Sequence, residues 1–288
     1  MIATPAVLRE FVERALAEDL GRGDATTQAL FSDPIVTEGR ISARVATVMA
    51  GGPLAALVFE HLDPAVAVEL TAVEGSPIGD NGSLLTVRGD GRTILSAERV
   101  ALNILQRLCG IAALTRTFVE ATREFNVKVV DTRKTPPGWR LLDKYAVRCG
   151  GGSNHRMGLD DGILIKDTHL ALIGATQTGR VAEAVRRAKA SGGRLLKVEV
   201  EVQTLDEVRE AVDAGVDVIL LDNMSVDEIR AALVLIKRRA QVEVSGGVTL
   251  RTIRDIAALG IDVISVGALT HSVPAADLHL DVWPTPSR

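Results

Sequence analysis

The stretch AGVDVILLDN, residues 214–223, decides the fold class of this protein. A glycine is followed by a nearly continuous apolar run that closes on Asp222 and Asn223. Such a run is typical of a parallel strand buried on both faces, and the glycine is typical of the end of a preceding helix. The stretch therefore predicts one strand of an α/β sheet, with polar side chains at its carboxyl end.

The same pattern returns at LGIDVISVGA, residues 259–268. Further β-branched runs lie at residues 127–133, 162–167, 195–202 and 241–247. Amphipathic helical patterns separate these runs, and this alternation indicates βα units in a parallel sheet. We expect a TIM-like α/β barrel over residues 111–270, closed or left open, with about six or seven parallel strands.

Residues 1–110 have a different pattern. Their apolar runs at 39–52, 65–73 and 83–95 are joined by the turn sequences GDNG (79–82) and GDG (89–91), as in antiparallel or mixed sheets. A long helical pattern over residues 96–124 follows. We expect an N-terminal α/β sandwich domain that this helix joins to the barrel. The tail, residues 271–288, is expected to pack back on the N-terminal domain.

Composition excludes several classes of protein. The net charge is −4 and aromatic residues make up 3% of the chain, which argues against a nucleic-acid partner. No apolar run approaches the ~18–20 residues of a membrane span, and the acidic, amphipathic start argues against a targeting peptide. Cys109 and Cys149 form no CxxC pair. They are expected to be reduced thiols in a cytoplasmic protein.

Carboxylates and glycines recur where the expected barrel strands end. Glu201 and Asp222 close neighbouring strands, so their carboxylates should converge and suit Mg²⁺ near phosphates. The alternative is that each acid caps a helix or pairs with a lysine. For Glu199 this structural role is as well supported by the sequence as a functional one. The turns Ser245-Gly246-Gly247 and Gly267-Ala268 follow the last two strands, where barrels bind phosphate, although ordinary tight turns also use glycine.

Cations are concentrated between residues 131 and 169, where seven Lys or Arg residues accompany five Asp and no Glu. Such a local excess in an acidic chain favours a small anionic ligand. Four of them, together with His155, lie at or near two strand ends: Arg133, Lys134, Arg156 and Lys166. Arginine pairs bidentately with carboxylates, so the group suits a ligand with more than one carboxylate. The alternative is a solvated salt-bridge network with nearby aspartates.

The segment GGGSNHR, residues 150–156, resembles a phosphate loop at first sight. The later glycine turns are better candidates for phosphate. We therefore interpret these glycines as a tight turn that directs His155 and Arg156 toward the barrel mouth.

A family resemblance rests on many ordered motifs. The segment DTRKTPPGWRLLDKYAVRCGGGSNHRMGLDDGILIKDTH (131–169) closely resembles the signature of quinolinate phosphoribosyltransferase, also called nicotinate-nucleotide pyrophosphorylase (carboxylating). The likeness extends over nearly the whole chain through GRGDATT (21–27), SAERVALNILQRLCGIA (96–112), KVEVEV (197–202), LLDN (220–223), SGGV (245–248) and VGALTHS (266–272). Two positions depart from the family pattern: Thr168 replaces an Asn, and Cys109 replaces a Ser.

The resemblance implies transfer of a phosphoribosyl group from 5-phosphoribosyl-1-pyrophosphate (PRPP) to quinolinate. Decarboxylation accompanies the transfer and gives nicotinate mononucleotide, pyrophosphate and CO₂ in NAD biosynthesis. It also implies Mg²⁺ as cofactor and a homodimer in which Arg99 reaches the neighbouring active site. By the same analogy, Arg133, Arg156 and Lys166 bind the quinolinate carboxylates, with His155 close by.

The remaining roles also come from the resemblance. Lys134 is expected to face the phosphates of PRPP, and Glu201 and Asp222 to hold Mg²⁺ and the ribose hydroxyls. Catalysis is assigned to these three residues together with Lys166. The 5-phosphate is expected at Ser245, Gly246, Gly247, Gly267 and Ala268.

Two other functions remain open at this point. Lys166 ends a strand, as the lysine of a Schiff-base aldolase does. An oxyanion-binding accessory protein of the same fold is the other alternative, although the complete GGGSNHR and LIKD segments argue against it.

Overall fold

The computed structural model describes residues 4–173, 179–191 and 196–285. The chain folds into two compact units. Unit 1 comprises Met1–Arg116, Pro136–Gly151 and Ser272–Arg288, and unit 2 comprises Thr117–Thr135 and Gly152–His271. The sequence assigned residues 1–110 and the tail 271–288 to the N-terminal domain; unit 1 extends instead to Arg116 and also contains Pro136–Gly151, which the sequence placed in the barrel.

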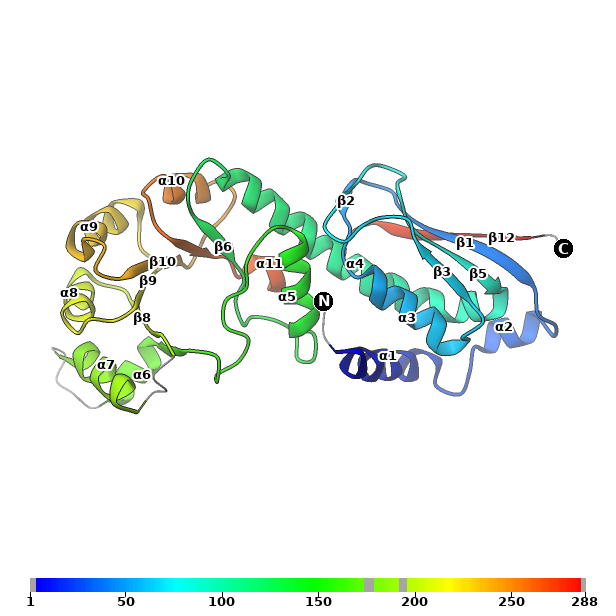
Figure 1. Cartoon of the computed structure of the whole chain (residues 1–288), viewed down its shortest axis with the longest axis horizontal. Helices are drawn as coiled ribbons and strands as arrows, with labels where there is room; N and C mark the ends of the chain where they lie inside the picture. The colour runs from blue at the N-terminus through cyan, green and yellow to red at the C-terminus, as the bar shows by residue number, and fades with distance from the viewer. Residues whose placement is uncertain (1–3, 174–178, 192–195, 286–288) are drawn as a thin grey trace. The chain divides into compact units, whose positions relative to one another are not determined.

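Unit 1 is built on an antiparallel sheet with the strand order β12-β1-β5-β3. Its strands are β1 (Val36–Ala43), β3 (Ala67–Leu70), β5 (Ser83–Asp90) and β12 (Leu278–Pro284). A short sheet joins β2 (Thr47–Val48) to β4 (Pro77–Ile78). The strand β12 pairs along β1, so the C-terminal segment forms an edge of the N-terminal sheet (Figure 1).

Helices accompany this sheet: α1 (Pro5–Leu20), α2 (Ala25–Leu30), α3 (Gly52–Leu62), α4 (Gly91–Thr122) and α5 (Arg140–Cys149). The helix α3 packs against β3 and α1. It buries Leu54, Val58 and Phe59, while the sheet buries Ile41 and Leu85. A sheet with helices packed against it is the expected α/β sandwich.

The start of α4 corrects one expectation. The sequence predicts strand through Leu95 and a turn at residues 89–91, yet β5 ends at Asp90 and α4 begins at Gly91. The Asp90 carboxylate explains the difference, because it accepts the backbone N–H of Arg92 (3.1 Å) and that of Ile35 (3.3 Å). It satisfies a donor that the first helical turn leaves unpaired. Although burial raises the pKa of Asp90, hydrogen bonds from Arg92 and Ile35 outweigh it and lower that pKa.

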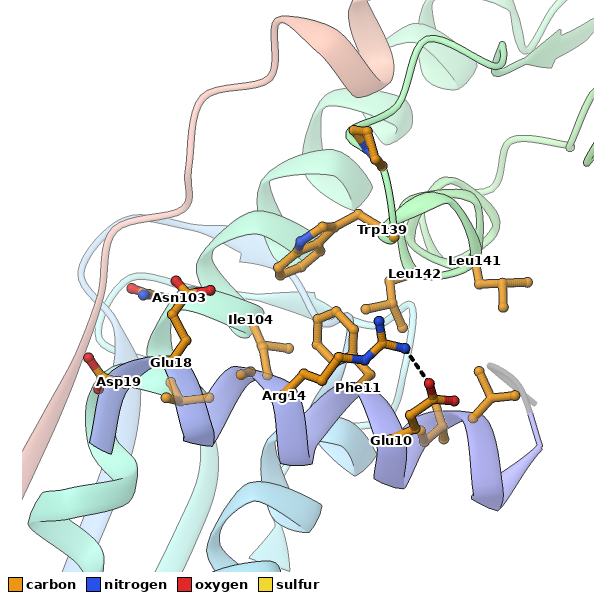
Figure 2. Close-up of a pocket in the computed structure, with 16 residues that line it drawn as sticks. Glu10, Phe11, Arg14, Glu18, Asp19, Asn103, Ile104, Trp139, Leu141 and Leu142 are labelled. Atoms are coloured by element: carbon orange, nitrogen blue, oxygen red, sulfur yellow. Dashed lines mark hydrogen bonds and ion pairs between the residues drawn. The ribbon is translucent and has the colours of Figure 1, made fainter. Parts of the chain in front are cut away.

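A hollow of about 370 Å³ lies in unit 1 beside α1 and α4 (Figure 2). Phe11 and Trp139 face each other there edge to face, with ring centroids 4.9 Å apart. The Arg107 guanidinium lies 5.6 Å from the Trp139 ring centroid and donates two hydrogen bonds to the buried carboxylate of Asp143, at 2.8 and 2.7 Å. The aromatic pair and this partly buried ion pair hold the first turn of α5 within unit 1.

Unit 2 is built on a parallel sheet with the strand order β6-β11-β10-β9-β8-β7. Its strands are β6 (Lys128–Val130), β7 (Ile163–Ile165), β8 (Val198–Val202), β9 (Val218–Asp222), β10 (Gln241–Ser245) and β11 (Val263–Ser265). Within the described ranges β6 and β7 stand at the two ends of this order and do not pair with each other. An isolated parallel bridge joins Val130 of β6 to Ser153 and extends the sheet beyond β6. The unit therefore has six named parallel strands, within the expected six or seven, and its two end strands are not joined.

Helices alternate with these strands: α6 (Asp167–Leu172), α7 (Arg180–Ser191), α8 (Leu205–Asp213), α9 (Val226–Ile236), α10 (Ile253–Ala257) and α11 (Ala268–His271). Gly215 and Gly260, at φ +68° and +77°, follow α8 and α10 as expected of helix stops. Leu195, the first residue of one expected strand, lies outside the described residues. Among the helices in the described ranges, none is long and apolar enough to cross a membrane.

Alternation along the strands decides which side chains face inward. On β8, Val198, Val200 and Val202 are buried, and Glu199 and Glu201 occupy the positions between them. Acidic side chains therefore share one face of the sheet, and valines fill the other.

Candidate active site

A cavity of about 530 Å³ lies at the carboxyl ends of the strands of unit 2. Cations, carboxylates and glycines expected from the sequence share its lining with residues that the sequence did not single out. Its lining residues are Thr132, Arg133, Lys134, His155, Arg156, Leu164, Lys166, Glu201, Leu220, Asp222, Asn223, Glu243, Ser245, Gly246, Gly247 and Ser265.

Two carboxylates from neighbouring strands line this cavity. Glu201, on β8, has a side chain that is 10% exposed, and its Oε2 lies 3.0 Å from Lys166 Nζ. Asp222 ends β9 and accepts a hydrogen bond from Asn223 Nδ2 at 2.7 Å. Only oxygen ligands are offered here, which is the donor set that Mg²⁺ prefers. The two residues therefore fit a magnesium ion.

The arginines form a second charged wall. Arg156 Nη1 donates to the carbonyl oxygen of Gly162 at 3.0 Å. Burial and the neighbouring charge of Arg133 lower the pKa of Arg156. The Nε of Arg133 is buried and has no hydrogen-bond partner within the described parts of the chain. Two like charges and an unsatisfied donor at one cavity wall suit an anionic ligand, which would neutralise the repulsion and accept the hydrogen bond.

His155 is enclosed by acids on the inner face of the sheet. Its Nε2 lies 3.3 Å from Glu199 Oε2 and 3.4 Å from Glu243 Oε2, and its backbone N–H donates to the buried Asp131 carboxylate at 3.0 Å. Burial alone would lower the pKa of His155, but the hydrogen bonds and charges of the two glutamates outweigh it and raise the pKa to about 10. The two carboxylates therefore favour the charged form of the ring, while burial and the charge of Glu243 raise the pKa of Glu199.

The ligand atoms of His155, Glu199 and Glu243 lie within 4.8 Å of one another. They are of the types that bind transition metals. Here these atoms are engaged with one another in ion pairs, so we treat the three residues as a buried ion-pair cluster.

The two glycine turns differ in their relation to the cavity. Gly246 has φ +87°, and a Cβ placed there would lie 2.2 Å from Asn223 Oδ1 and 2.8 Å from its backbone nitrogen. Only glycine therefore fits where this backbone approaches Asn223. Gly267 precedes α11, and a Cβ there would lie 2.9 Å from His271 Nε2. Gly267 and Ala268 are not among the residues that line the cavity.

Arg99 is the one predicted site residue that comes from unit 1. It is exposed on α4, whereas the lining of the cavity comes from unit 2.

Comparison with known proteins explains why these groups occur together. The family model for the N-terminal domain of quinolinate phosphoribosyl transferase matches residues 24–109, and that for its C-terminal domain matches residues 111–281. The chain belongs to the quinolinate phosphoribosyltransferase family.

The sequences and structures of several relatives match this chain over almost its entire length. The probable nicotinate-nucleotide pyrophosphorylase [carboxylating] of Bacillus subtilis (strain 168) is 39% identical, and the match covers 96% of this chain and 93% of the relative. The solved structure of NadC from Streptococcus pyogenes is 39% identical with a TM-score of 0.92, covering 99% of each chain. The nicotinate-nucleotide pyrophosphorylase from Francisella tularensis is 37% identical with a TM-score of 0.90, covering 98% of each chain.

The two departures from the quinolinate phosphoribosyltransferase pattern are accommodated locally. Cys109 is buried and its Sγ donates to the carbonyl oxygen of Ala50 at 3.5 Å, a contact that a serine hydroxyl could also make. Burial raises the pKa of Cys109 to about 12, so the thiol is unreactive at neutral pH. Thr168 is exposed in the first turn of α6, where its backbone N–H donates to Asp167. Neither residue lines the cavity.

Sequence reasoning missed Glu243 and did not assign Glu199. A signal was available, because QVEVS on β10 alternates as VEVEV does on β8, and this spacing puts Glu243 on the same face as Ser245. The sequence named Asn223 only as a polar strand end, without a role, and did not single out Leu164 or Leu220; all three line the cavity.

Proposed function

We propose that this chain is a quinolinate phosphoribosyltransferase (decarboxylating). It transfers the phosphoribosyl group of PRPP to quinolinate and releases pyrophosphate and CO₂, forming nicotinate mononucleotide for NAD biosynthesis. The observation that carries this proposal is the meeting of arginines, an acidic pair and a glycine turn around one cavity, in a chain that matches both domains of the family. The arginines suit the carboxylates of quinolinate, and the acidic pair and the glycine turn suit the metal and the phosphate of PRPP.

The quinolinate carboxylates are assigned to Arg133, Arg156 and Lys166, with His155 beside them. Support comes from the shared cavity wall and from the Nε of Arg133, which has no hydrogen-bond partner among the described residues. Leu164 and Leu220 add apolar surface that a pyridine ring can contact.

PRPP is assigned to the opposite side of the site. Ser245, Gly246 and Gly247 offer backbone N–H groups to its 5-phosphate. Gly267 and Ala268 form a separate turn after β11 and are assigned to the same phosphate, although they do not line the cavity. Lys134 is assigned to the pyrophosphate, which it neutralises as the bond to the sugar breaks. The carbonyl oxygen of Lys134 accepts a hydrogen bond from Thr270 Oγ1 at 2.8 Å, which ties this residue to α11.

Mg²⁺ is the proposed cofactor, held by Glu201 and Asp222. When bound, it neutralises the oxygens of the pyrophosphate. Removing the metal with a chelator should abolish product formation, and adding Mg²⁺ back should restore it; activity that persists in chelator would contradict this assignment.

The reaction follows from positioning and charge. The ring nitrogen of quinolinate forms a bond to the anomeric carbon as the bond to pyrophosphate breaks, and acidic groups stabilise the positive charge that develops on the sugar. The resulting quaternary nitrogen then favours loss of the 2-carboxylate as CO₂, because the electrons left on the ring lie beside a positive charge. A proton replaces the carboxylate. No covalent intermediate with the protein is involved.

A Schiff base at Lys166 fits the structure poorly. Its side chain is 43% exposed and ion-paired with Glu201, whereas lysines that form Schiff bases are commonly desolvated or beside another cation. Borohydride with a carbonyl substrate should trap no adduct there.

The assembly and location are also proposals. A homodimer would supply the exposed Arg99 of one protomer to the site of the other, and the enzyme is assigned to the cytoplasm.

The decisive experiment incubates the purified chain with quinolinate, PRPP and Mg²⁺ and measures nicotinate mononucleotide and CO₂. Nicotinate replaces quinolinate in a parallel reaction as the control substrate. We expect product from quinolinate only. A preference for nicotinate would overturn the substrate, and heat from oxyanion binding without any from quinolinate would favour an accessory binding protein.

A further inference from the structure

A second hollow of unit 2, of about 690 Å³, lies at the amino ends of β9, β10 and β11. Its lining includes Asp217, Gln241 and Asp262, which precede or begin these three strands. The carboxyl ends of the same strands line the active-site cavity, and the two sites share no lining residue. We call this second site the amino-side hollow.

The loop that follows α9 at this hollow has an unfavourable backbone. Lys237 and Arg238 line the hollow, and their φ angles are +49° and +58°. The other non-glycine residues with positive φ in the described ranges are Asn81 and Asn223, and asparagine tolerates this conformation far better than lysine or arginine. Residues kept in such a conformation are typical of ligand-binding sites, because stability alone would select glycine or asparagine.

These two cations are free to bind a ligand. Both are exposed, and neither side chain makes a hydrogen bond or an ion pair with any residue that the structure describes. Arg239 follows them in the same lining, with Nη1 3.5 Å from Asp213 and Nη2 donating to the carbonyl oxygen of Leu235 at 3.2 Å. Three successive cations at the edge of one hollow suit the phosphates of an anionic ligand.

The remaining lining is not that of a simple phosphate site. Val216, Ile236 and Leu259 give it apolar surface. Asp217 and Asp262 each use Oδ2 to accept the backbone N–H of a strand residue at 2.8 Å. The second oxygen of each carboxylate has no such partner within the described chain and is suited to accept a hydroxyl group. Phosphates, hydroxyls and an apolar ring occur together in a nucleotide.

We propose that the amino-side hollow binds a nucleoside polyphosphate. Lys237, Arg238 and Arg239 take the phosphates, the two aspartates accept the ribose hydroxyls, and the apolar surface contacts the base. An inorganic polyphosphate would use the cations alone and be repelled by the aspartates. This site goes beyond the proposed function and does not depend on it.

Calorimetry of the full chain with ATP measures binding directly. Replacing both Lys237→Gly and Arg238→Gly should weaken ATP binding about 100-fold or more, about tenfold for each charged contact. Tripolyphosphate and adenosine, titrated separately, should each bind more weakly than ATP. Tripolyphosphate that binds as tightly as ATP would overturn the nucleotide as the ligand.

Thermal unfolding supplies a second readout. Because glycine relieves the positive φ at both positions, the double variant without ATP should unfold at a Tm about 2–4 °C above that of the wild type. A variant that is more stable and yet fails to bind ATP shows that the two side chains are kept for the ligand. A lower Tm in this variant would mean that they are kept for stability and would overturn the proposal.

Two control variants separate this site from other cations. Arg230→Ala removes an exposed cation of α9 that is not part of the hollow, and Lys134→Ala removes a cation of the active-site cavity. Both should keep the ATP affinity of the wild type. An ATP affinity that falls in Lys134→Ala and persists in the double glycine variant would place ATP in the active site and overturn the proposal. A wild-type chain that gives no heat with ATP would overturn it as well, and the proposed function would stand.

Discussion

Arg156 and Lys166 line one cavity but are held by different partners, a backbone carbonyl for Arg156 and the Glu201 carboxylate for Lys166. Removing either charge should cost ~2.7–4 kcal/mol of transition-state stabilisation, as for other charge-stabilising contacts. We therefore expect Arg156→Ala and Lys166→Ala each to lower kcat/KM for quinolinate about 100- to 1000-fold.

Steady-state kinetics check this expectation, with Arg230→Ala as control. Arg230 is exposed on α9 and pairs only with Asp227 at the surface in the described structure, so its removal should leave kcat/KM unchanged. Near wild-type kinetics for Arg156→Ala or Lys166→Ala would refute the assignment of that residue.

Gly246 offers a comparison between backbone strain and steric clash. Alanine at Gly246 meets the unfavourable φ of +87° and also Asn223 within 3 Å, whereas alanine at Gly260 meets a similar φ of +77° with no atom within 4 Å. Both substitutions should cost about 1–2 kcal/mol of stability from strain. Only Gly246→Ala should raise KM for PRPP, because only there must the phosphate turn move. Equal KM values for PRPP in the two variants would place the phosphate elsewhere.

At the scale of elements, α9 follows the strand that carries Asp222 and begins with a capping box. Ser225 Oγ accepts the backbone N–H of Glu228 at 3.3 Å, and Glu228 Oε2 accepts the backbone N–H of Ser225 at 2.8 Å. Ser225→Ala should lower the free energy of unfolding by about 0.5–2 kcal/mol without changing either KM. Urea unfolding measures this, with Ser225→Thr as the variant that keeps the cap. Unchanged unfolding in Ser225→Ala would show that the cap contributes no stability.

Local signals predicted the strands of unit 2 well, because each run is apolar, short and bounded by glycine or polar residues. The start of α4 was missed for a physical reason. Residues 92–95 are themselves β-branched or apolar in part, and the Asp90 carboxylate that initiates the helix also bonds Ile35, far away in sequence. Local residue propensities do not reveal a contact between residues so far apart in the sequence.

At the scale of the whole molecule, the shared-site proposal depends on assembly. Neither an Arg99→Ala chain nor an Arg156→Ala chain should be active alone. Mixing them under conditions of subunit exchange should restore activity in up to about a quarter of the sites, because random pairing gives mixed dimers with one intact site each. Activity and molar mass are measured together on the mixture. Mixed dimers that stay inactive would remove the main support for a shared site.

The division into units was the part of the fold least accessible from sequence. The segment Pro136–Gly151 lies between two barrel strands along the chain, yet it belongs to unit 1. The ion pair of Arg107 with the buried Asp143 shows why, since it ties α5 to α4 through groups that look like surface charges in the sequence.

The sequence by itself determined the succession of βα units, the glycine turns and the charged residues at the strand ends, but not whether the barrel is closed or open. These features depend on the types and spacing of residues within one segment, and residue propensities and hydrophobic periodicity reveal them. Only the tertiary structure decided that Glu199 and Glu243 meet at His155. Their meeting depends on the strand order around β9 and on burial, which makes an unpaired carboxylate costly. Both are set by how several segments pack together, so the sequence of one segment does not reveal them.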